Sequence, residues 1–267
     1  MVTFIATPIG NLKDISLRAL EALKEADVIF CEDTRHTIKL LNAYEIKKPL
    51  YACHKFNEAE AAAKILERSR AGEKVAIVSD AGTPVVSDPG NTVCKFLKEA
   101  GEPYTLIPGA SAFVAALVLS ALDADRFAFI GFLPDKASEK RAVLEKYKDL
   151  DLTLCFHSAP QDVDKDIKAM YEVFGDRKGA AVREITKIHE ESVSVMLSEG
   201  LSGETRGEYV LLVEGAKEKE NPLCSLGEKE HIEYYMHQGL EKKEALKRAA
   251  KDRGVSKSDL YKFAIDL

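Results

Sequence analysis

Short apolar runs rich in β-branched residues alternate with stretches of helical periodicity from residue 2 to about residue 185. The clearest run, Lys74–Ser79 (KVAIVS), carries apolar residues at consecutive positions and not at every second one. This pattern is typical of a strand whose two faces are both covered in a parallel sheet. Strands that alternate with helices in this way predict an α/β fold with right-handed crossovers.

The first half of the chain follows this alternation closely. Leu17, Leu20 and Leu23 have the spacing of one buried helical stripe, and Ser16 can cap the start of that helix. We predict strands at residues 2–6, 27–32, 50–54, 74–79 and 104–107, and helices at residues 16–26, 35–43, 58–70, 88–100 and 111–122.

The second half departs from strict alternation. We predict strands at residues 127–132, 152–156, 179–184, 191–196 and 208–213, and helices at residues 138–147 and 162–174. The last two strands have no helix before them, which favours an antiparallel or mixed sheet. The polar residues 217–222 are typical of a linker.

These patterns predict an N-terminal α/β domain at residues 1–110, a second α/β domain at 111–216 and a helical C-terminal module at 228–267. Between residues 241 and 262 the module carries eight Lys and Arg residues against four Asp and Glu, a local net charge of +4 in a chain of −6. A helix, a turn at Gly254 and a second helix opened by Ser256 give helix-turn-helix-like spacing. The module either contacts RNA or is a solvated pair of surface helices.

The composition is that of a globular protein, with 46% apolar and 31% charged residues. No run of about 18 apolar residues occurs, so we expect no membrane span, and Met1–Ala6 lacks the basic region of a signal peptide. The five cysteines are never in C-x-x-C spacing. We therefore expect a cytoplasmic location, no zinc site and no disulfide framework. The negative net charge confines any nucleic-acid contact to a local basic face.

Several catalytic motifs are absent from the sequence, namely G-x-x-x-x-G-K-[ST], G-x-G-x-x-G, G-x-S-x-G and H-E-x-x-H. The chain therefore offers no loop built for a pyrophosphate. A cofactor such as S-adenosylmethionine needs none, because it presents an adenosine, an amino-acid zwitterion and a sulfonium.

Loops that combine Pro, Gly and polar residues follow the predicted strands of the first half. The strongest is Asp80–Pro84, and the others are Thr7–Leu12, Glu32–His36 and Pro108–Ala112. The carboxyl ends of parallel strands meet at one sheet edge, so we expect these loops to converge on a ligand site. Taken singly, each can be an ordinary turn, with Asp88 or Ser111 acting as a helix cap.

These loops belong to a longer series of ordered motifs. The series runs ATPIGNL at 6–12, CEDTRHT at 31–37, SDAGTP at 79–84, SDPG at 87–90, PGASA at 108–112, GFLP at 131–134, REITKIHE at 183–190 and GEYVLLVEG at 207–215. Together the motifs resemble the tetrapyrrole methylase superfamily, and within it the branch of small-subunit ribosomal RNA methyltransferases. CEDTRH and REITK distinguish this branch from the cobalamin and siroheme methylases.

The resemblance implies two α/β domains, S-adenosylmethionine in the cleft between them, and a homodimer. It also implies 2′-O-methylation of a cytidine in the decoding centre of 16S ribosomal RNA, with that RNA or the small ribosomal subunit as the partner. Carried onto this sequence, the cofactor contacts are expected at Pro8, Asp80, Ala81, Gly82, Thr83, Pro84, Ser111, Ala112, Phe156, Ala181 and Gly207.

The sequence departs from the branch in two places. The usual P-G-P-S-A has Ala110 in place of its second proline, a mild loss of rigidity. The usual Y-E-S-P-H-R is replaced by Phe156–Gln161 (FHSAPQ). If the missing Glu, His and Arg position RNA or shape the ligand pocket, the activity is altered while the fold is not.

A ribose hydroxyl is a poor nucleophile, so a base or a cationic neighbour should help it lose its proton. Glu184 and Lys187, just past a predicted strand, are the first candidates, although an ion pair that only holds a loop is the alternative. The other candidates are Glu32, Asp33, His36 and Glu190. Phosphate contacts are predicted at Arg35, Arg183 and Lys187. We predict no metal site, because His36, His157 and His189 lack the spacing of metal ligands.

Two other functions remain open on the same scaffold. One is a small-molecule tetrapyrrole methylase, against which CEDTRH, REITK and the basic tail argue. The other is a non-catalytic protein that binds RNA or the ribosome, which the departure at Phe156–Gln161 favours.

Overall fold

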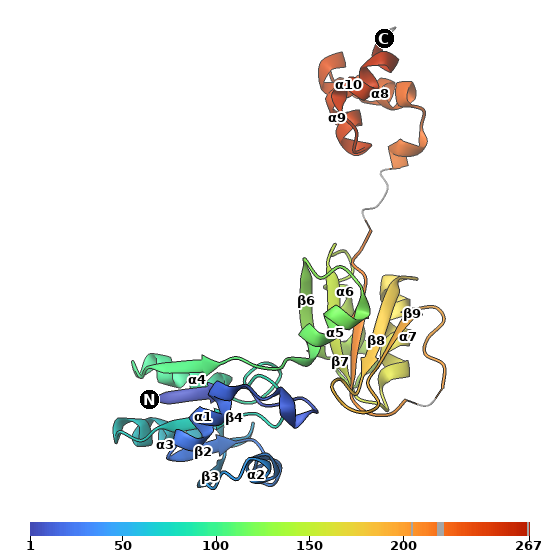
Figure 1. Cartoon of the computed structure of the whole chain (residues 1–267). Coiled ribbons are helices and arrows are strands. Elements are labelled where there is room, and N and C mark those ends of the chain that lie inside the picture. The colour runs from blue at the N-terminus through green and yellow to red at the C-terminus, as the bar shows by residue number, and fades with distance from the viewer. Residues whose placement is uncertain (204, 218–221, 266) are drawn as a thin grey trace. The chain divides into compact units, whose positions relative to one another are not determined.

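The computed structural model describes residues 1–203, 205–217, 222–265 and 267. These residues form two compact units, Met1–Gly215 and Ala216–Leu267 (Figure 1). Residues 218–221 of the predicted linker lie outside the described residues. In the part of the chain that the structure describes, no helix has both the length and the apolar character to cross a bilayer.

The first sheet of the larger unit is entirely parallel and has the order β3-β2-β4-β1-β5. Its strands are β1 (Val2–Ile5), β2 (Val28–Cys31), β3 (Leu50–Ala52), β4 (Val75–Val78) and β5 (Tyr104–Ile107). All residues of β2 and β4 are buried. This confirms the interpretation of 74–79 as a strand covered on both faces.

Helices cover both faces of this sheet. They are α1 (Leu17–Glu25), α2 (Thr34–Ala43), α3 (Glu58–Arg70) and α4 (Asn91–Glu99), with a short 3₁₀ helix at Leu12–Asp14. One face packs Phe4, Phe30 and Ile77 against Ile65 of α3 and Leu97 of α4. The other face packs Ile5, Ile29 and Val78 against α1 and α2 through Leu23 and Leu41.

The second sheet is mixed, as the sequence predicts. Its order is β6-β7-β10-β8-β9, with β6 parallel to β7 and the remaining neighbours antiparallel. The strands are β6 (Phe127–Phe132), β7 (Thr153–Ser158), β8 (Lys178–Arg183), β9 (Glu191–Met196) and β10 (Tyr209–Val213).

Three helices pack on the second sheet. They are α5 (Ala112–Ser120) on one face, and α6 (Ala137–Glu145) and α7 (Val163–Phe174) on the other. The helix α5 packs on this sheet through Ala116 and Leu117. The first helix that belongs to the second sheet therefore begins directly after residue 111. The exact limits 1–110 and 111–216 stay a prediction.

Two local expectations are wrong. The helix predicted at 88–100 begins at Asn91, because Gly90 has φ +126° and takes the N-cap position, so Asp88 is not the cap. Leu17 is 77% exposed, because the buried face of α1 runs through Ala19 and Leu23. The predicted cap at Ser16 is confirmed: its hydroxyl accepts a hydrogen bond from the Ala19 N–H at 3.1 Å.

The C-terminal unit has a core of its own. It contains α8 (Glu228–His237), α9 (Lys242–Asp252) and α10 (Lys257–Tyr261), with 3₁₀ turns at Pro222–Ser225 and Lys262–Ala264. Ile232, Leu246 and Leu260 form the centre of its apolar cluster. The predicted helix, turn and helix are present, with Gly254 at φ +65° between α9 and α10.

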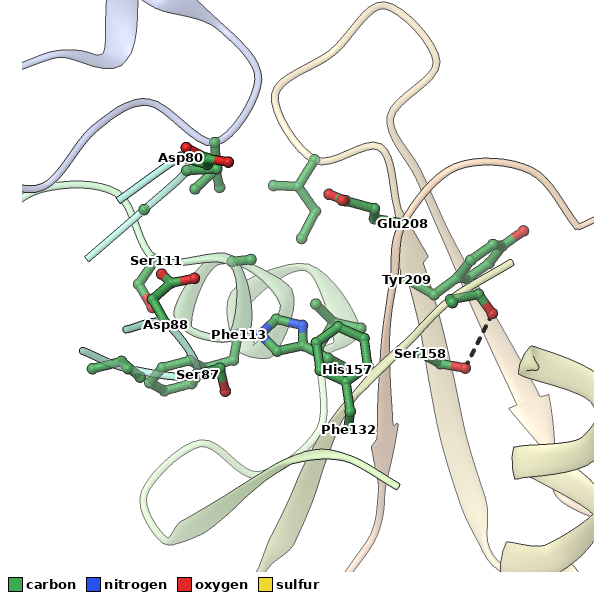
Figure 2. Close-up of a pocket in the computed structure, with 18 of the residues that line it drawn as sticks. Asp80, Ser87, Asp88, Ser111, Phe113, Phe132, His157, Ser158, Glu208 and Tyr209 are labelled. Carbon is green, nitrogen blue, oxygen red and sulfur yellow. Dashed lines mark hydrogen bonds between the residues drawn. The ribbon is translucent and has the colours of Figure 1, made fainter. Parts of the chain in front are cut away.

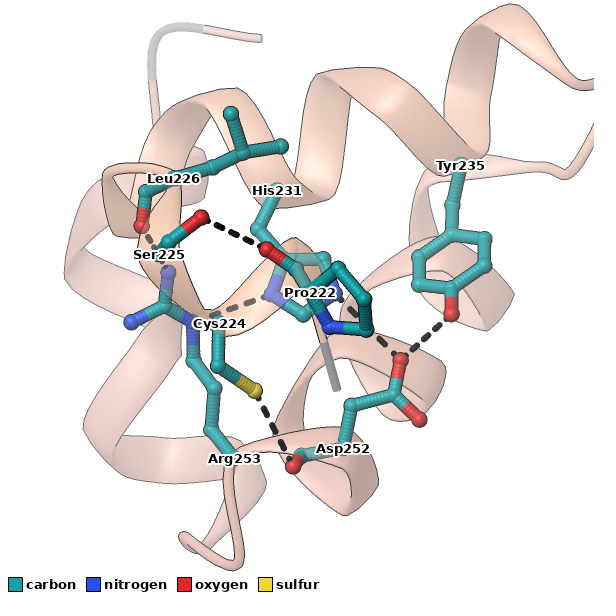
Figure 3. A network of polar contacts seen from close by, with 8 residues as sticks. All are labelled: Pro222, Cys224, Ser225, Leu226, His231, Tyr235, Asp252 and Arg253. Atoms are coloured by element: carbon teal, nitrogen blue, oxygen red, sulfur yellow. Dashed lines mark hydrogen bonds and ion pairs between the residues drawn. The ribbon is translucent and has the colours of Figure 1, made fainter. Parts of the chain in front are cut away.

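A polar network ties α8 to the end of α9 (Figure 3). The fully buried His231 lies 3.3 Å from Asp252 Oδ2 through its Nε2, and its Nδ1 accepts a hydrogen bond from Arg253 Nε at 3.1 Å. Tyr235 also donates to Asp252 Oδ2, and Arg253 donates to the carbonyl of Leu226. The acceptor role of Nδ1 fits a neutral imidazole, which donates from Nε2.

Candidate functional site

The larger unit contains a pocket with a cavity volume of about 430 Å³. This volume lies within the range of roughly 300–1,000 Å³ typical of small-molecule sites. Its walls come from the loop after β4, the start of α5, the ends of β6, β7 and β8, and the start of β10. The pocket therefore draws on both sheets (Figure 2).

The Asp80–Pro84 loop is fixed by backbone and side-chain hydrogen bonds. Thr7 and Gly82 exchange two backbone hydrogen bonds, at 2.9 and 3.1 Å. Thr83 donates to the carbonyl of Ala110 at 3.3 Å, and Asp80 Oδ1 accepts from the Asp33 N–H at 3.1 Å. The loops after β1, β2, β4 and β5 thus converge, as the sequence predicts, and these hydrogen bonds fix the conformation of the Asp80–Pro84 loop.

A second connection joins the loop after β1 to the segment after β8. The Asn11 N–H donates to Thr186 Oγ1 at 2.9 Å. A Cβ on Gly10 would lie 2.7 Å from Lys187 Cγ and 2.8 Å from the carbonyl oxygen of Ile185. Position 10 therefore needs glycine, because the two segments approach more closely than a side chain allows.

Glu184 and Lys187 line the pocket and form an ion pair with each other, with Lys187 Nζ 2.9 Å from Glu184 Oε1. The hydrogen bond from Lys187 lowers the pKa of the Glu184 carboxyl, and the Glu208 N–H adds a contact at 3.4 Å. A carboxylate with a lowered pKa is a weak base. Glu184 also has φ +49° and Thr186 has φ +66°, so the pair holds a strained segment in place.

Asp88 provides a second carboxyl group in the pocket. Burial, together with the nearby charges of Glu32 and Asp80, raises the pKa of Asp88 to about 7. Burial also raises the pKa of Glu32, with a contribution from Asp80. Asp88 lies in a contorted loop, because Val85 has φ +78° and Ser87 has φ +65°.

Aromatic rings line the side of the pocket formed by β6 and β7. Phe132 is 63% exposed, and its ring centroid lies 5.3 Å from that of His157. His157 contacts Phe129 edge to face at 5.1 Å, and Phe129 stacks on Phe113 at 4.4 Å. Burial lowers the pKa of His157, so its imidazole is favoured in the neutral form.

Ser111 takes the N-cap position of α5, but its side chain makes no capping hydrogen bond. Its hydroxyl lines the pocket near Asp88 in the view of Figure 2. Of the two roles considered from the sequence, a cap or a ligand contact, the geometry favours the ligand contact.

The structure brings many of the expected site residues to the pocket. Those that line it are Asp80, Ala81, Gly82, Thr83, Ser111, Ala112, Glu184 and Lys187. Five others stand away from the lining, namely Pro8, Pro84, Phe156, Ala181 and Gly207. Of these five, all except Ala181 are next in the chain to a lining residue. Their roles in cofactor binding stay predictions.

Two predicted RNA contacts lie away from the pocket lining. Arg35 has 88% of its side chain exposed and forms an ion pair with Asp33, which lowers the pKa of Asp33 to about 2. Arg183 lies 2.7 Å from Glu191 Oε2. Both guanidinium groups are neutralised by a neighbouring carboxylate, and their contact with phosphate stays a prediction.

Sequence reasoning missed Asp88, Phe132, His157, Glu208 and Tyr209 as lining residues. Asp88 was interpreted as a helix cap and Phe132 as the last residue of a strand. His157 stood out only as a departure from the pattern of related sequences. A useful signal was available, because SDPG and GFLP are motifs whose glycines bring backbone segments together. Ser87 Oγ would lie 3.3 Å from a Cβ on Gly131.

The residues present fit S-adenosylmethionine. Asp80 and Glu208 offer carboxyl groups that suit an ammonium or a sulfonium cation, and Ser111 offers a free hydroxyl. The backbone of the Asp80–Pro84 loop suits the polar edges of an adenosine or an amino acid, and Phe113 and Val210 supply apolar surface.

The comparisons with known proteins agree with this fit. The model of the family "Tetrapyrrole (Corrin/Porphyrin) Methylases" matches residues 1–199. The Bacillus subtilis protein named "Ribosomal RNA small subunit methyltransferase I" is 40% identical over 96% of this chain and 91% of its own length. The protein of the same name from Pseudomonas aeruginosa is 39% identical over 98% of this chain and 95% of its own length.

Solved structures share the fold of the larger unit. The methyltransferase CobJ has a TM-score of 0.62 at 21% identity, over 80% of this chain and 94% of its own. Uroporphyrin-III C-methyltransferase from Thermus thermophilus, complexed with S-adenosylhomocysteine, has a TM-score of 0.57 at 20% identity, over 80% of this chain and 96% of its own.

Proposed function

The chain belongs to the tetrapyrrole (corrin/porphyrin) methylase family, and we propose that it transfers a methyl group from S-adenosylmethionine to small-subunit ribosomal RNA. The observation that carries this proposal is the pocket, where the loops after β1, β4 and β5 of the first sheet meet the strand ends of the second sheet. Relatives with a ribosomal RNA methyltransferase name align over nearly the whole chain, which favours RNA over a tetrapyrrole as the substrate.

The proposed acceptor is the 2′-hydroxyl of a cytidine in the decoding centre of 16S ribosomal RNA. When bound, S-adenosylmethionine supplies a methyl carbon already activated by the sulfonium. The pocket residues therefore act mainly by positioning the reacting atoms and by removing one proton. The Asp80–Pro84 loop and Ser111 are suited to orient the cofactor, and the carboxylates beside them favour its positive charge.

The C-terminal unit is the proposed RNA contact outside the pocket. Its surface has a hollow lined by Lys242, Lys243, Leu246, Lys257, Ser258 and Tyr261. Lysine ammonium groups bind phosphates, and an exposed tyrosine can stack on an unpaired base. This arrangement favours the RNA-contacting interpretation of the basic tail over a merely solvated helix pair.

A homodimer in the cytoplasm completes the proposal. The larger unit exposes Val118 to 77% and Leu119 to 39% on α5, and Phe127 to 42% on the edge strand β6. Neighbouring exposed apolar residues are typical of a protein interface. The expected substrate, the small ribosomal subunit, is a component of the cytoplasm.

The test is transfer of a radioactive methyl group from S-adenosylmethionine. Purified protein is incubated with small subunits that lack the modification and, separately, with a precorrin-type tetrapyrrole. We expect labelling of the RNA, with the methyl group on a cytidine 2′-oxygen after nuclease digestion. Labelling of the tetrapyrrole alone would favour the small-molecule methylase, and subunit binding without labelling would favour the non-catalytic protein.

A further inference from the structure

Phe132 exposes a large apolar ring at the pocket. It is 63% exposed at the end of β6, where it lines the pocket beside His157 (Figure 2). His157 is itself held against Phe129 at 5.1 Å, so the Phe132–His157 pair lies on a packed aromatic support. A large apolar ring that lines a pocket and is left in water indicates a ligand that covers it.

The chemistry of the proposed reaction suggests which ligand that is. A nucleotide stacked inside folded RNA must leave its stack before its ribose can enter a pocket. The base then loses its neighbours, and aromatic side chains commonly replace them in proteins that recognise RNA. A phenylalanine at the rim, beside the methyl donor pocket, is suited to this role.

Asp88 belongs to the same part of the pocket. Its neighbour Ser87 packs against Gly131, the residue before Phe132, where a Cβ would lie 3.3 Å from Ser87 Oγ. The loop that carries Asp88 and the strand end that carries Phe132 are therefore in contact. Figure 2 shows Asp88 next to Ser111, with His157 and Phe132 on the β6 and β7 side of the same pocket.

We propose that Phe132, His157 and Asp88 form a subsite for the target nucleotide, in which the Phe132 ring stacks on the base and the Asp88 carboxylate accepts the proton of the ribose hydroxyl. This inference rests on the proposed methylation of RNA and adds the residues that receive its substrate. In the transfer step the ribose oxygen forms a bond to the methyl carbon while the carbon–sulfur bond breaks. The proton moves to Asp88 and from there to water, and the sulfur leaves as a neutral thioether.

The charges around Asp88 suit it to this task. Its pKa of about 7 makes it a stronger base than an ordinary carboxylate while leaving it largely ionised just above neutral pH. Glu184, by contrast, has a lowered pKa because Lys187 binds it. The charged and titratable groups that face this part of the site are Glu32, Glu58, Asp80, His157, Glu184, Lys187 and Glu208.

The stacking role of Phe132 is tested by Phe132→Ala, with Phe56→Ala as the control. Phe56 is 93% exposed and lies outside the pocket lining. Loss of one stacked base should weaken binding of unmodified small subunits by about five- to a hundredfold, and Phe132→Tyr should restore it. Affinity for S-adenosylhomocysteine should stay unchanged. Equal subunit affinity for Phe132→Ala and wild type would overturn the stacking role.

The role of Asp88 as the proton acceptor is tested by the pH dependence of single-turnover methyl transfer. The wild-type rate should rise with pH, reach half of its maximum near pH 7 and level off at higher pH, because only ionised Asp88 accepts the proton. Asp88→Asn should lose this rise and most of the rate, yet still bind S-adenosylhomocysteine in calorimetry. Glu32→Gln should move the rise to lower pH, because it removes a charge that raises the pKa of Asp88.

The outcomes separate this inference from the proposed function. Transfer by wild type with an unchanged pH profile in Asp88→Asn would overturn the base assignment and leave the function standing. Absence of transfer by wild type to small subunits would overturn both.

Discussion

At the residue scale, the site depends on positions where a side chain is excluded. Gly10 is the clearest, because a Cβ there would lie 2.7 Å from Lys187 Cγ and 2.8 Å from the Ile185 carbonyl oxygen. We expect Gly10→Ala to destabilise the larger unit by about 1–3 kcal/mol, the usual cost of forcing an extra methyl group into packed atoms. It should also weaken S-adenosylmethionine binding, because the segment after β8 lines the pocket.

Thermal unfolding and calorimetric titration measure these two effects. Lys187→Ala in the Gly10→Ala background removes the clash with Lys187 Cγ but leaves the clashes with Thr186 Oγ1 and the Ile185 carbonyl oxygen, so the double variant should regain part of the stability. An alanine at position 10 with wild-type stability would mean that the close approach of the two segments is not needed.

At the scale of elements, the network between α8 and α9 makes the C-terminal unit sensitive to pH. Burial lowers the pKa of His231, with Asp252 raising it and Arg253 lowering it. The unfolded state therefore binds a proton at a pH where folded His231 does not, and stability falls as pH drops below the ordinary histidine value of about 6.5. Above that pH the contribution of His231 is complete.

Hydrogen exchange of the full-length chain tests this dependence. Protection factors of the amides in α8, α9 and α10 should fall between pH 7 and pH 5, after correction for intrinsic exchange rates. His231→Gln should flatten the dependence, whereas His237→Gln, at an exposed position of the same helix, should preserve it. A wild-type profile independent of pH would contradict the neutral, buried role of His231.

The bounds of helices and strands were the features that the sequence predicted most accurately. Apolar periodicity and caps located α3 and β5 to the residue, because Glu58–Arg70 and Tyr104–Ile107 carry unambiguous patterns. The start of α4 was missed, because Gly90 has φ +126° and its N–H donates to Glu58 Oε1, a tertiary contact that no local pattern contains. Asp88, Phe132 and His157 were missed for the same reason, since their meeting depends on tertiary contacts between the two sheets.

At the scale of the whole molecule, two units with separate cores indicate that cofactor binding and RNA binding depend on different parts of the chain. The larger unit contains the pocket, and the smaller unit carries the lysine-lined hollow on its own apolar cluster. We expect deletion of residues 216–267 to leave S-adenosylmethionine affinity within about twofold while weakening small-subunit binding. The salt dependence of that binding should also become shallower, because phosphate contacts are lost. Equal affinity of the full-length and the truncated chain for small ribosomal subunits would show that the C-terminal unit takes no part in RNA recognition.

The central claim is that the pocket of the larger unit binds S-adenosylmethionine, and calorimetric titration of this cofactor tests it most directly. Ala112→Leu places a larger side chain at the first position of α5, inside the pocket, while Ala137→Leu makes the same change at the first position of α6, outside the lining. The account predicts that wild type and Ala137→Leu bind alike and that Ala112→Leu binds at least about tenfold more weakly, a difference of about 1.4 kcal/mol. Wild-type affinity in Ala112→Leu, or no binding by wild type at millimolar cofactor, would contradict it.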